Sequence, residues 1–537
     1  MNITENINSH SKKNPNKIAL QYKVKGNYNT LTFLELENLS NIYANGLQEC
    51  GFKKGDKTLL FIRPSLDFHA IVFALFKLGV IPILIDPGMG RKNLLDAISK
   101  SKPIGLIAEP EVHLLSLFFR DKFKSIKIKV SSKYIPLSKA ITISSLKKST
   151  SNYLCEDMDK DELAAILFTS GGTGAPKGVE YTHNIFSKQT EILEDLFKLN
   201  INDIDLPGFP LFSLFTLCIG MTSCIPNMDP SKPAKANPKK LVENINHYKC
   251  TFIAGSPAIW ENVANYCIAN NLKLPSVKYV VMFGAPVSVS LHKTFINILP
   301  KGTTYTPYGA TESLPIANIS GKIILNETAS LTEQGKGTCV GKAVLGTDIK
   351  VIKISDNKIS NINEIEELKE LDIGEIIVQG DVVTKSYFNL IKETEISKIY
   401  DIENNKVWHR VGDLGYLDNQ KRLWFCGRKS HRISINNKLN CSINFESIIN
   451  THQDVEKSAM INYGTKDAPK VGIAVILKST SKNKENIKKN ILDFALKNDL
   501  TKDLNNVFFC KKFPVDIRHN IKIDRLKLGK LASQGNL

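Results

Sequence analysis

The sequence lacks the features that mark a zinc-stabilised, disulfide-rich or secreted protein. Its ten cysteines are scattered and form no C-x-x-C pair, so neither a zinc site nor a disulfide framework is indicated. A reduced cytosolic compartment fits this cysteine usage best. The first 17 residues are polar and contain no apolar core, which argues against a signal peptide. We therefore expect a cytoplasmic protein.

Uninterrupted apolar runs of membrane-spanning length are also missing. The stretch 70–85 is broken by Lys77 and Pro82, and it reads better as a helix that enters a buried strand. The stretch 206–228 carries no charge, but it contains three prolines and two glycines. Proline and glycine at this density argue against a lone spanning helix. An apolar wall of a substrate tunnel is the more plausible role for this stretch.

Basic runs interleaved with aromatic residues are absent too, although the 537 residues carry a formal net charge of +18. Such a charge suits nucleic acid, an anionic membrane or a polyanionic substrate. A lysine-rich composition spread over solvated faces explains it more simply. We therefore expect no nucleic-acid partner, and the sequence does not indicate peripheral membrane association. The length and the hydrophobic content of 42% predict a large domain plus a smaller one.

What the sequence does contain is a glycine-rich loop between two strand-like runs, in the segment AAILFTSGGTGAPKGVEYTH at residues 164–183. Glycines allow backbone N–H groups to turn toward an anion, and Lys177 adds a mobile positive charge. Pro176 before that lysine excludes a Walker A loop. Composition alone suits a flexible surface loop equally well. The flanking strands favour phosphate binding, with these candidates: Thr169, Ser170, Gly171, Gly172, Thr173, Gly174 and Lys177.

Strands and helices alternate through most of the chain. A strand at 57–61, a helix at 66–78 and a strand at 80–85 follow one another, and strands at 251–254 and 277–283 are each followed by a helix. This order indicates parallel sheet and an α/β class. Beyond Gly427 the chain becomes more charged, which suggests a smaller α+β domain. The polar segment 354–371 reads as a surface insertion.

Two further motifs carry groups suited to a nucleotide. In YGATES, at residues 308–313, the hydroxyl of Thr311 lies beside the carboxylate of Glu312. A hard cation needs such groups alongside phosphate oxygens, so both residues are candidates for Mg²⁺ and phosphate. In HRVGDLGYLD, at residues 409–418, Asp413 projects from a glycine-bounded turn and could accept both hydroxyls of a ribose. A lone Gly-Asp pair is otherwise a common turn.

These motifs resemble those of the adenylate-forming superfamily, which includes acyl-CoA synthetases, firefly luciferase and the adenylation domains of peptide synthetases. The loop differs from the usual TSGSTG-x-PKG mainly at Gly172, and YGATE matches Y-G-x-T-E. The resemblance implies ATP and Mg²⁺ as cofactors, with Glu312 at the metal. It also implies an adenine site that is formed by Gly284, Ala285, Pro286, Tyr308 and Gly309.

The resemblance extends to the C-terminal part of the chain. It assigns Asp413 to ribose, Arg428 to ribose and phosphate, and Lys522 to catalysis, although Ile521 replaces the usual glycine. The planar guanidinium suits such ligands, and the ammonium would neutralise the substrate carboxylate and the α-phosphate as they meet. Lys522 could otherwise be one lysine among many on a basic tail. Ser430 falls at the hinge position, where the family more often has Asp or Lys.

The implied architecture is a large N-terminal domain, residues 1–427, with mixed, mostly parallel sheets and helices, and a small mobile α+β lid, residues 428–537. The implied reaction is attack of a carboxylate on the α-phosphorus of ATP, which gives an acyl adenylate and Mg²⁺-pyrophosphate. The residues expected to act in catalysis are Lys522, Thr311, Glu312 and Lys177.

Three other stretches are more informative about the acyl acceptor. They are IDPGMGRKNLL from Ile85, DLPGFPLFSLFTLCIGMTSCIPNMDPSKPA from Asp205, and FPVDIRHN with CGRKSHR. All resemble the olefin β-lactone synthetases, and the resemblance covers about residues 16–528. It implies a long-chain 2-alkyl-3-hydroxy acid, whose own hydroxyl attacks the adenylated carboxyl without a thiol. Other enzymes of olefin biosynthesis are then expected as pathway partners. The segment 206–228 would line a pocket for two alkyl chains, with Phe209, Phe212 and Phe215 as wall residues. The alternative is that these aromatics are only core residues.

The acyl acceptor and the base for ring closure stay open at this point. His431 and His519 lie in the branch-like motifs, but a lone histidine more often serves structure. One alternative function is a fatty acyl-CoA synthetase, or a fatty acyl-AMP ligase that passes the acyl group to a carrier protein. Another is an inactive lipid-binding homologue. The motif residues speak against the last: Lys177, Glu312, Asp413, Arg428 and Lys522.

Overall fold

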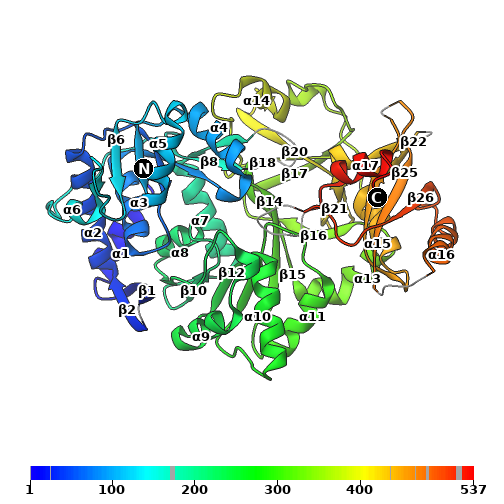
Figure 1. Cartoon of the computed structure of the whole chain (residues 1–537), viewed down its shortest axis with the longest axis horizontal. Helices are drawn as coiled ribbons and strands as arrows, with labels where there is room; N and C mark the ends of the chain where they lie inside the picture. The colour runs from blue at the N-terminus through cyan, green and yellow to red at the C-terminus, as the bar shows by residue number, and fades with distance from the viewer. Residues whose placement is uncertain are drawn as a thin grey trace.

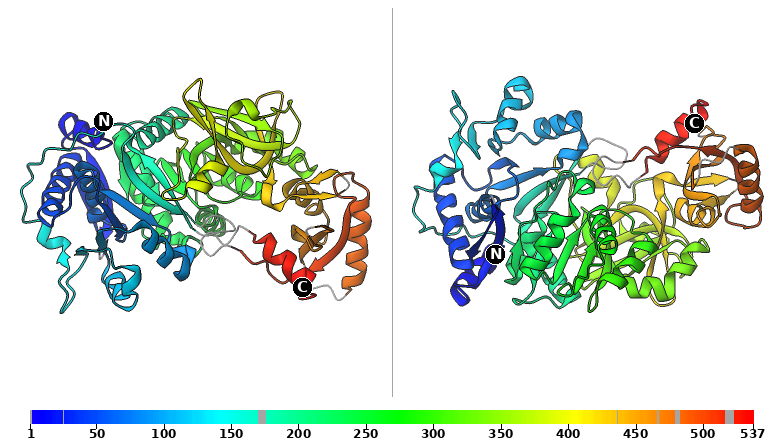
Figure 2. Two further views of the ribbon diagram at one scale, coloured as in Figure 1. Left: turned by 90° about the horizontal axis from the view of Figure 1, so that it is seen from above. Right: turned by 60° about the horizontal axis from the view of Figure 1, so that its bottom comes forward.

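The computed structural model describes residues 2–24, 26–169, 176–435, 437–465, 467–478, 483–515 and 523–537. The elements form an elongated molecule with the first helices near one end and the C-terminal elements at the other (Figure 1). Two further views show that the C-terminal elements project beside the rest of the molecule (Figure 2).

A seven-stranded sheet forms one half of the N-terminal part. Its order is β7 (Ile141–Thr142), β6 (Ile128–Ser131), β5 (Gly105–Ala108), β3 (Lys57–Phe61), β4 (Ile81–Ile85), β8 (Leu163–Thr169) and β9 (Lys177–Thr182). All neighbouring pairs are parallel except β8 with β9. Because parallel strands need crossover connections, helices pack on this sheet.

Helix α3 (Leu66–Leu78) shows why this sheet lies deep in the core. Every residue from Phe68 to Leu78 is buried, as expected for a helix that is apolar on all sides. One of these buried residues, Lys77, is basic, and its ammonium lies 2.7 Å from the carboxylate of Glu37 on α2 (Phe33–Glu49). The predicted strand, helix and strand between residues 57 and 85 are confirmed.

A 14-stranded sheet forms the other half. Its order is β17 (Thr347–Ile352), β18 (Gly374–Gly380), β20 (Lys406–Leu417), β21 (Leu423–Arg428), β16 (Thr338–Ala343), β15 (Ser313–Ser320), β14 (Thr303–Ala310), β13 (Tyr279–Met282), β12 (Phe252–Gly255), β10 (Ile204–Pro207), β11 (Thr222–Cys224), β1 (Ile18–Val24) and β2 (Asn27–Thr32), with β19 (Lys398–Asp401) beside β20. The sheet is parallel from β14 to β1 and antiparallel from β17 to β14. The predicted α/β class with mixed sheets is therefore confirmed.

The remaining helices connect or cover these strands. They are α1 (Glu5–Lys13), α4 (Arg91–Ser101), α5 (Pro110–Phe118), α6 (Ile143–Leu146), α7 (His183–Phe197), α8 (Phe212–Ile219), α9 (Pro238–Tyr248), α10 (Pro257–Ala269), α11 (Val289–Ile298), α12 (Gly321–Ile323), α13 (Ala329–Glu333) and α14 (Ile391–Ser397). Several begin with a side-chain cap, such as Ser288 for α11. The helices predicted after residues 254 and 283 are confirmed as α10 and α11.

The chain after Arg428 forms sheets of its own. A hairpin joins β22 (Ile433–Ile435) to β23 (Lys438–Asn440), and a three-stranded sheet contains β24 (Val455–Asn462), β25 (Val471–Leu477) and β26 (Leu504–Phe509). Helices α15 (Ser442–Ile449), α16 (Lys484–Leu496) and α17 (Arg525–Ser533) accompany them. The core beneath includes Phe445, Ile473 and Val475, so this part buries its own apolar face.

No helix in the described segments has both the length and the apolar character needed to cross a membrane. The charge-free stretch 206–228 contains the end of β10, helix α8 and strand β11. The prediction that this stretch is not a spanning helix is therefore confirmed. Gly208, Pro210 and Gly220 lie between these elements, whereas Pro207 ends β10 and Pro226 follows β11.

Candidate active site

A single large cleft gathers most of the predicted site residues. Its volume is about 2390 Å³, and its lining comes from both large sheets and from the chain after Arg428. The loop after β13 and the turn after β14 both contribute to it. Ligands in α/β proteins commonly bind at the carboxyl ends of the strands, so this position is expected. The predicted residues that line the cleft are Lys177, Gly284, Ala285, Pro286, Tyr308, Gly309, Thr311, Glu312, Asp413 and Arg428.

Other predicted residues lie outside the described part of the chain. They are Ser170, Gly171, Gly172, Thr173, Gly174, His519 and Lys522. Thr169 is the last residue of β8 and pairs through its backbone with Lys177 of β9. The two described ends of the glycine-rich loop are thus held together, and Lys177 reaches the cleft. The phosphate-binding role of the loop itself stays a prediction.

Three residues assigned to the nucleoside meet in direct contact. The Tyr308 hydroxyl donates to Asp413 Oδ2 at 2.6 Å, and the Arg428 guanidinium lies 2.9 Å from Asp413 Oδ1. The contact with Arg428 follows from the sheet, because Asp413 of β20 and Arg428 of β21 are register partners. Burial and the neighbouring carboxylate raise the pKa of Tyr308, so the phenol remains a hydrogen-bond donor.

The predicted metal and phosphate residues are fixed by contacts on both sides of the β14–β15 turn. Tyr387 donates its hydroxyl to Glu312 Oε1 at 2.6 Å, and the amide of Thr384 donates to the backbone oxygen of Glu312 at 2.9 Å. Tyr181 donates to the backbone oxygen of Thr311 at 2.6 Å. A carboxylate held in this way is pre-oriented for a cation, since neighbouring hydrogen bonds orient metal ligands.

Two cationic side chains flank Tyr387. Lys177 Nζ lies 4.8 Å from the centroid of the Tyr387 ring, and Lys398 Nζ lies 6.0 Å from it. Lys398 is completely buried and donates to the backbone oxygen of Thr384. Burial lowers its pKa to about 7. Lys177 therefore places positive charge beside Tyr387 in the cleft, which suits the phosphates of a nucleotide, whereas the buried Lys398 is charged mainly below pH 7.

Sequence reasoning missed Tyr387, Lys398 and His409. Lys398 of β19 and His409 of β20 are direct register partners, so their side chains share one face of the sheet. Burial and the charge of Lys398 lower the pKa of His409 well below its ordinary value, which keeps the imidazole neutral. His409 lines the cleft, and its Nδ1 has no hydrogen-bond partner among the described residues. Of these three residues, only His409 lies in a motif that the sequence singles out, as the first residue of HRVGDLGYLD.

The side chains present fit a magnesium ion that is bound together with nucleotide phosphates. Within the described ranges, no group of three or more His, Cys, Asp or Glu residues could hold a metal ion. Mg²⁺ commonly uses one or two carboxylates and completes its shell with substrate phosphates and water. Glu312 lines the cleft, Tyr387 fixes its carboxylate, and Lys177 lines the same cleft. Glu312 is thus the carboxylate that suits this ion.

An apolar region of the cleft adjoins the nucleoside residues. The ring of Phe212 on α8 lies with its centroid 4.5 Å from that of Phe283, 5.7 Å from Phe209 and 5.8 Å from Phe215. All four rings line the cleft. Phe215 also belongs to the core cluster beside α3, whereas Phe212 only packs against that cluster. The two interpretations of these aromatics, cleft wall and core, therefore both apply.

His431 is the described candidate for a base. It lines the cleft, and burial lowers its pKa to about 4, with Arg525 and Arg428 contributing. Its imidazole is therefore neutral near pH 7. On either side of the segment that contains Lys522, Val515 and Ile523 also line the cleft.

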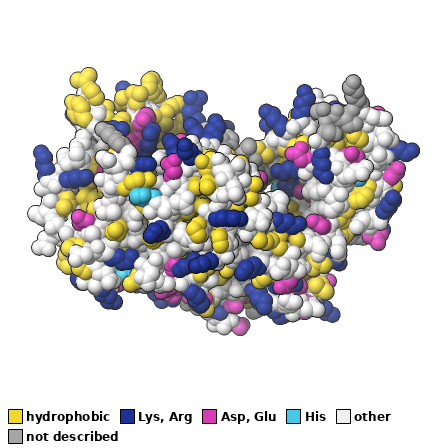
Figure 3. Space-filling model, turned by 90° about the horizontal axis from the view of Figure 1, so that it is seen from below, with side chains coloured by type: hydrophobic (Ala, Val, Ile, Leu, Met, Phe, Trp, Pro, Cys, Tyr) yellow, Lys and Arg dark blue, Asp and Glu magenta, His cyan; other side chains and the backbone are white. Residues whose placement is uncertain are grey.

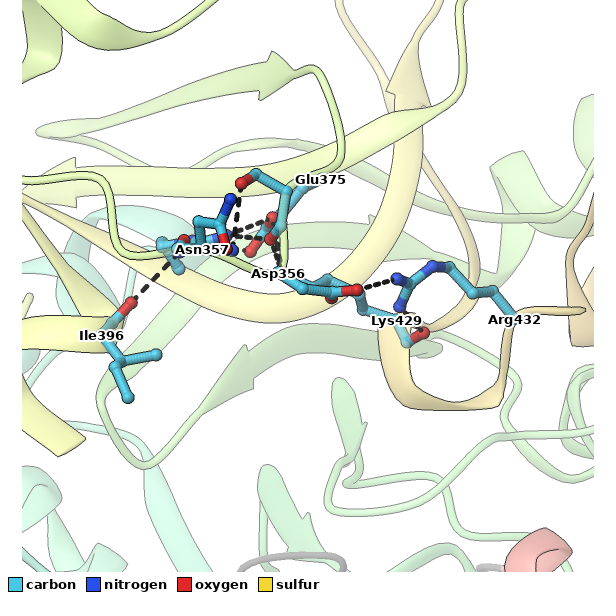
Figure 4. A network of polar contacts seen from close by, with 8 residues as sticks. Asp356, Asn357, Glu375, Ile396, Lys429 and Arg432 are labelled. Atoms are coloured by element: carbon cyan, nitrogen blue, oxygen red, sulfur yellow. Dashed lines mark hydrogen bonds and ion pairs between the residues drawn. The ribbon is translucent and has the colours of Figure 1, made fainter. Parts of the chain in front are cut away.

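A polar network surrounds the predicted hinge at Ser430 (Figure 4). Lys429 Nζ lies 2.9 Å from Glu375 Oε2, and Arg432 lies 2.5 Å from Asp356. Glu375 is almost completely buried and also accepts two hydrogen bonds from Arg410, at 2.9 and 2.7 Å. The segment 354–371, predicted as a surface insertion, carries Asp356 and thus also contacts the chain beyond Arg428.

Comparison with known proteins places these features in a family. A family model described as AMP-binding enzyme matches residues 7–388. The chain is 35% identical over 510 residues to an olefin beta-lactone synthetase from Stenotrophomonas maltophilia, covering 94% of this chain and 91% of that protein. A second olefin beta-lactone synthetase, from Xanthomonas campestris, is 35% identical over 514 residues with the same coverage.

Solved structures share the fold. The O-succinylbenzoate coenzyme A synthetase of Bacillus subtilis, solved in complex with ATP and magnesium ion, superimposes with a TM-score of 0.76 at 20% identity. The match covers 97% of this chain and 99% of that chain. The fold therefore agrees over nearly the whole length.

Proposed function

The chain belongs to the AMP-binding enzyme family, and from that premise we propose that it adenylates a long-chain 2-alkyl-3-hydroxy acid and closes the product to a β-lactone. Membership makes the chain an ATP-dependent adenylate-forming enzyme that uses Mg²⁺. The acid and the ring closure are the proposal. The observation that carries it is the 35% identity to two olefin beta-lactone synthetases over 94% of this chain.

In the first step, a carboxylate oxygen of the acid attacks the α-phosphorus of ATP, and the bond to the pyrophosphate oxygen breaks. We assign Lys177, Thr311 and Glu312 to the phosphates. Bound Mg²⁺ would supply positive charge to the phosphate oxygens, with Glu312 as its protein ligand. Lys522 is the proposed catalytic lysine that neutralises the two reacting anions, and the loop 169–174 is proposed to hold the phosphates.

The nucleoside is proposed to bind through the contacts around Asp413. Its carboxylate accepts the ribose hydroxyls, Arg428 reaches ribose and phosphate, and the ring of Tyr308 packs on adenine beside Gly309. The loop residues Gly284, Ala285 and Pro286 complete the adenine site. Support comes from the geometry, because Tyr308 and Arg428 already contact Asp413 at 2.6 and 2.9 Å.

In the second step, the 3-hydroxyl of the substrate attacks the carbonyl carbon, and the bond from that carbon to the AMP oxygen breaks. The hydroxyl loses its proton in the process. Because nucleophile and electrophile belong to one molecule, the cleft needs only to hold them close together. Two neutral imidazoles in the cleft, His409 and His431, are candidates for accepting the proton.

The apolar region beside the nucleoside residues supports a lipid substrate. Phe209, Phe212, Phe215 and Phe283 line it, and aromatic side chains of this kind bury alkyl chains well. We also propose that the chain divides after Gly427 into a nucleotide-binding domain, residues 1–427, and a mobile lid, residues 428–537. The separate core and sheets after Arg428 support this division.

The first experiment is mass spectrometry of the products that the purified protein forms from ATP, Mg²⁺ and a racemic long-chain 2-alkyl-3-hydroxy acid, with and without coenzyme A. We expect a product lighter than the substrate by one water, together with AMP and pyrophosphate, in the absence of any thiol. A Lys177→Ala variant, purified in parallel, should form little product, which would exclude a contaminating enzyme.

Other results would contradict the proposal. A thioester that forms only with coenzyme A would identify an acyl-CoA synthetase, and an acyl adenylate that accumulates would identify an acyl-AMP ligase. No pyrophosphate release with any acid would indicate an inactive lipid-binding homologue.

A further inference from the structure

Helix α5 (Pro110–Phe118) presents three of its apolar side chains to the outside. Surface helices normally bury their apolar stripe. In α5 the buried side chains are His113 and Ser116, whereas Leu114, Leu117 and Phe118 are 56%, 53% and 76% exposed. His113 Nε2 lies 3.0 Å from the backbone oxygen of Val130 at the end of β6, and Ser116 donates to the backbone oxygen of His113 at 2.6 Å. These two polar residues thus anchor the helix, and the three exposed apolar side chains project.

A neighbouring loop adds two more exposed apolar side chains. Tyr134 is 75% exposed and Leu137 is fully exposed, both just after β6. The loop starts beside α5, because Ser132 hydrogen-bonds to Glu109 through its hydroxyl at 2.5 Å. We call the set Leu114, Leu117, Phe118, Tyr134 and Leu137 the α5 patch. Hydrophobic side chains project from the end of the molecule that carries α5 (Figure 3).

The surroundings of the α5 patch are basic. Residues 111–139 contain seven Lys or Arg residues and only two acidic ones. Most of these cations are exposed: Arg120, Lys124, Lys127, Lys133 and Lys139. Projecting apolar side chains within a basic surface are the combination that favours the interface of an anionic bilayer, because the apolar groups insert while the cations bind lipid headgroups. A patch for a protein partner would not need so one-sided a charge.

The same helix connects the α5 patch to the cleft. Val112 and Leu115 lie on another face of α5 and line the cleft, together with Glu111 and Arg63, which form an ion pair of 3.6 Å. One helix therefore separates the exposed patch from the interior of the cleft. A lipid that leaves a bilayer at the patch would meet apolar side chains on both sides of α5.

We propose that the α5 patch docks this protein on an anionic lipid bilayer, so that a lipid substrate passes α5 into the cleft. Docking itself does not rest on the proposed function, since it involves neither ATP nor ring closure. Failure of docking would leave the lactonisation test untouched, and the reverse is also true.

The test is co-sedimentation of the full chain with vesicles of phosphatidylcholine alone or mixed with phosphatidylglycerol. We expect binding to the mixed vesicles that weakens with added salt. The variant Leu117→Ser/Phe118→Ser/Leu137→Ser should bind the mixed vesicles more weakly by a factor of about ten or more. The variant Lys124→Glu/Lys127→Glu/Lys133→Glu should lose the preference for mixed vesicles.

A matched control carries the same kind of change elsewhere on the surface. Leu345, Ile391 and Ile402 are 61%, 76% and 76% exposed, and their triple change to Ser should leave vesicle binding as it is. ATP affinity and thermal unfolding should be equal in all variants, because none of the changed residues lines the cleft.

Three results would overturn the proposal. The first is no sedimentation of the wild type with mixed vesicles, and the second is equal binding by the α5-patch variant and the control. The third is a concentration-dependent dimer in sedimentation velocity that the α5-patch variant abolishes while vesicle binding persists, since the patch would then serve a second copy of the chain.

Discussion

At the scale of single residues, the hydroxyl of Tyr387 determines how Glu312 can act. Burial and the adjacent carboxylate raise the pKa of Tyr387, so the phenol stays protonated and continues to donate to Glu312. This bond fixes one carboxylate oxygen of Glu312, the proposed ligand of Mg²⁺, and so orients the carboxylate as a whole.

Removing that hydroxyl should impair adenylation more than folding. A hydrogen bond to a charged group contributes about 1.5–3 kcal/mol, so we expect Tyr387→Phe to slow pyrophosphate release by about 10- to 100-fold. The Mg²⁺ concentration for half-maximal ATP binding, measured by calorimetry, should rise as well. Tyr400→Phe, a change at an exposed tyrosine, is the matched control. An unchanged Mg²⁺ dependence in Tyr387→Phe would contradict the role.

Lys398 provides a prediction about pH. Burial lowers its pKa to about 7 from an ordinary value of 10.5, so between these values the unfolded chain binds the proton and the folded chain does not. Stability attributable to Lys398 therefore rises as the pH increases through this window, by up to about 1.4 kcal/mol per pH unit. Below pH 7 the charged form carries its full burial cost.

Replacement of Lys398 by methionine should remove this dependence. The free energy of unfolding of Lys398→Met minus that of the wild type should be largest at or below pH 7. This difference should decrease by roughly 3 kcal/mol between pH 7 and pH 9.5. Denaturant unfolding of both proteins side by side measures the difference. A difference that is constant with pH would show that Lys398 titrates normally.

The residues that sequence reasoning found and missed differ in a physical way. Glu312 and Asp413 lie in short motifs, where neighbours in the sequence indicate the chemistry. Tyr387 lies between β18 and α14 and reaches Glu312 across the fold, and Lys398 comes near it with the pairing of β19 and β20. Such pairings depend on the register of β19 and β20, and local sequence does not reveal that register.

At the scale of elements, α8 supplies Phe212 and Phe215 to the apolar region of the cleft. Phe212 projects from its first turn and packs on Phe283 beside the predicted adenine loop. Burying an aromatic or aliphatic side chain is worth about 1.5–3 kcal/mol. We therefore expect Phe212→Ala to raise the KM for a long-chain acid by about tenfold or more.

Substrate length supplies the control for Phe212→Ala. The KM for ATP should not change, and the effect should shrink with a short-chain acid that cannot reach α8. Steady-state pyrophosphate release with a series of acids measures both. An equal effect on short and long acids would mean that Phe212 acts through the stability of the cleft rather than through the alkyl chain.

Parallel elements were easier to predict than antiparallel ones. The alternation of strands and helices indicates βαβ units, which is why β3, β4, β12 and β13 were expected close to their observed bounds. Strands β16 to β21 have few helices between them, and β16 pairs with β21 across a long stretch of chain. Pairings over such distances leave little signal in the local sequence, so the strand order in this half of the sheet was not predicted.

At the scale of the whole molecule, the network around Ser430 links the C-terminal elements to the rest. Asp356 is 69% exposed, and exposed ion pairs contribute only about 0.2–1 kcal/mol. Loss of the Arg432 contact in Asp356→Ala should therefore shift the orientation of the C-terminal elements modestly. Glu375 is a different case, because it is buried and is shared by Arg410 and Lys429.

The prediction for Asp356→Ala concerns access to the predicted hinge at Ser430. We expect trypsin to cleave between Arg428 and Arg432 about two- to fivefold faster, as a shift of up to 1 kcal/mol allows, with no change in the midpoint of thermal unfolding. Glu366→Ala removes an exposed ion pair with Lys353 and is the control. Equal cleavage of Asp356→Ala and the control would show that Arg432 does not restrain the hinge.

Strand β20 serves several regions of the molecule at once. His409, Arg410, Val411 and Asp413 all line the cleft, and Arg410 also donates to Glu375 of the network beside Ser430. Because successive side chains of a strand point to opposite faces, inserting or deleting one residue in β20 would displace all of these side chains together. The proposed acyl wall comes from α8 and the loop after β13 instead. An engineer who wants a different substrate should therefore change Phe212, which only packs against the core cluster, before Phe215, which belongs to it, and should leave the length of β20 unchanged.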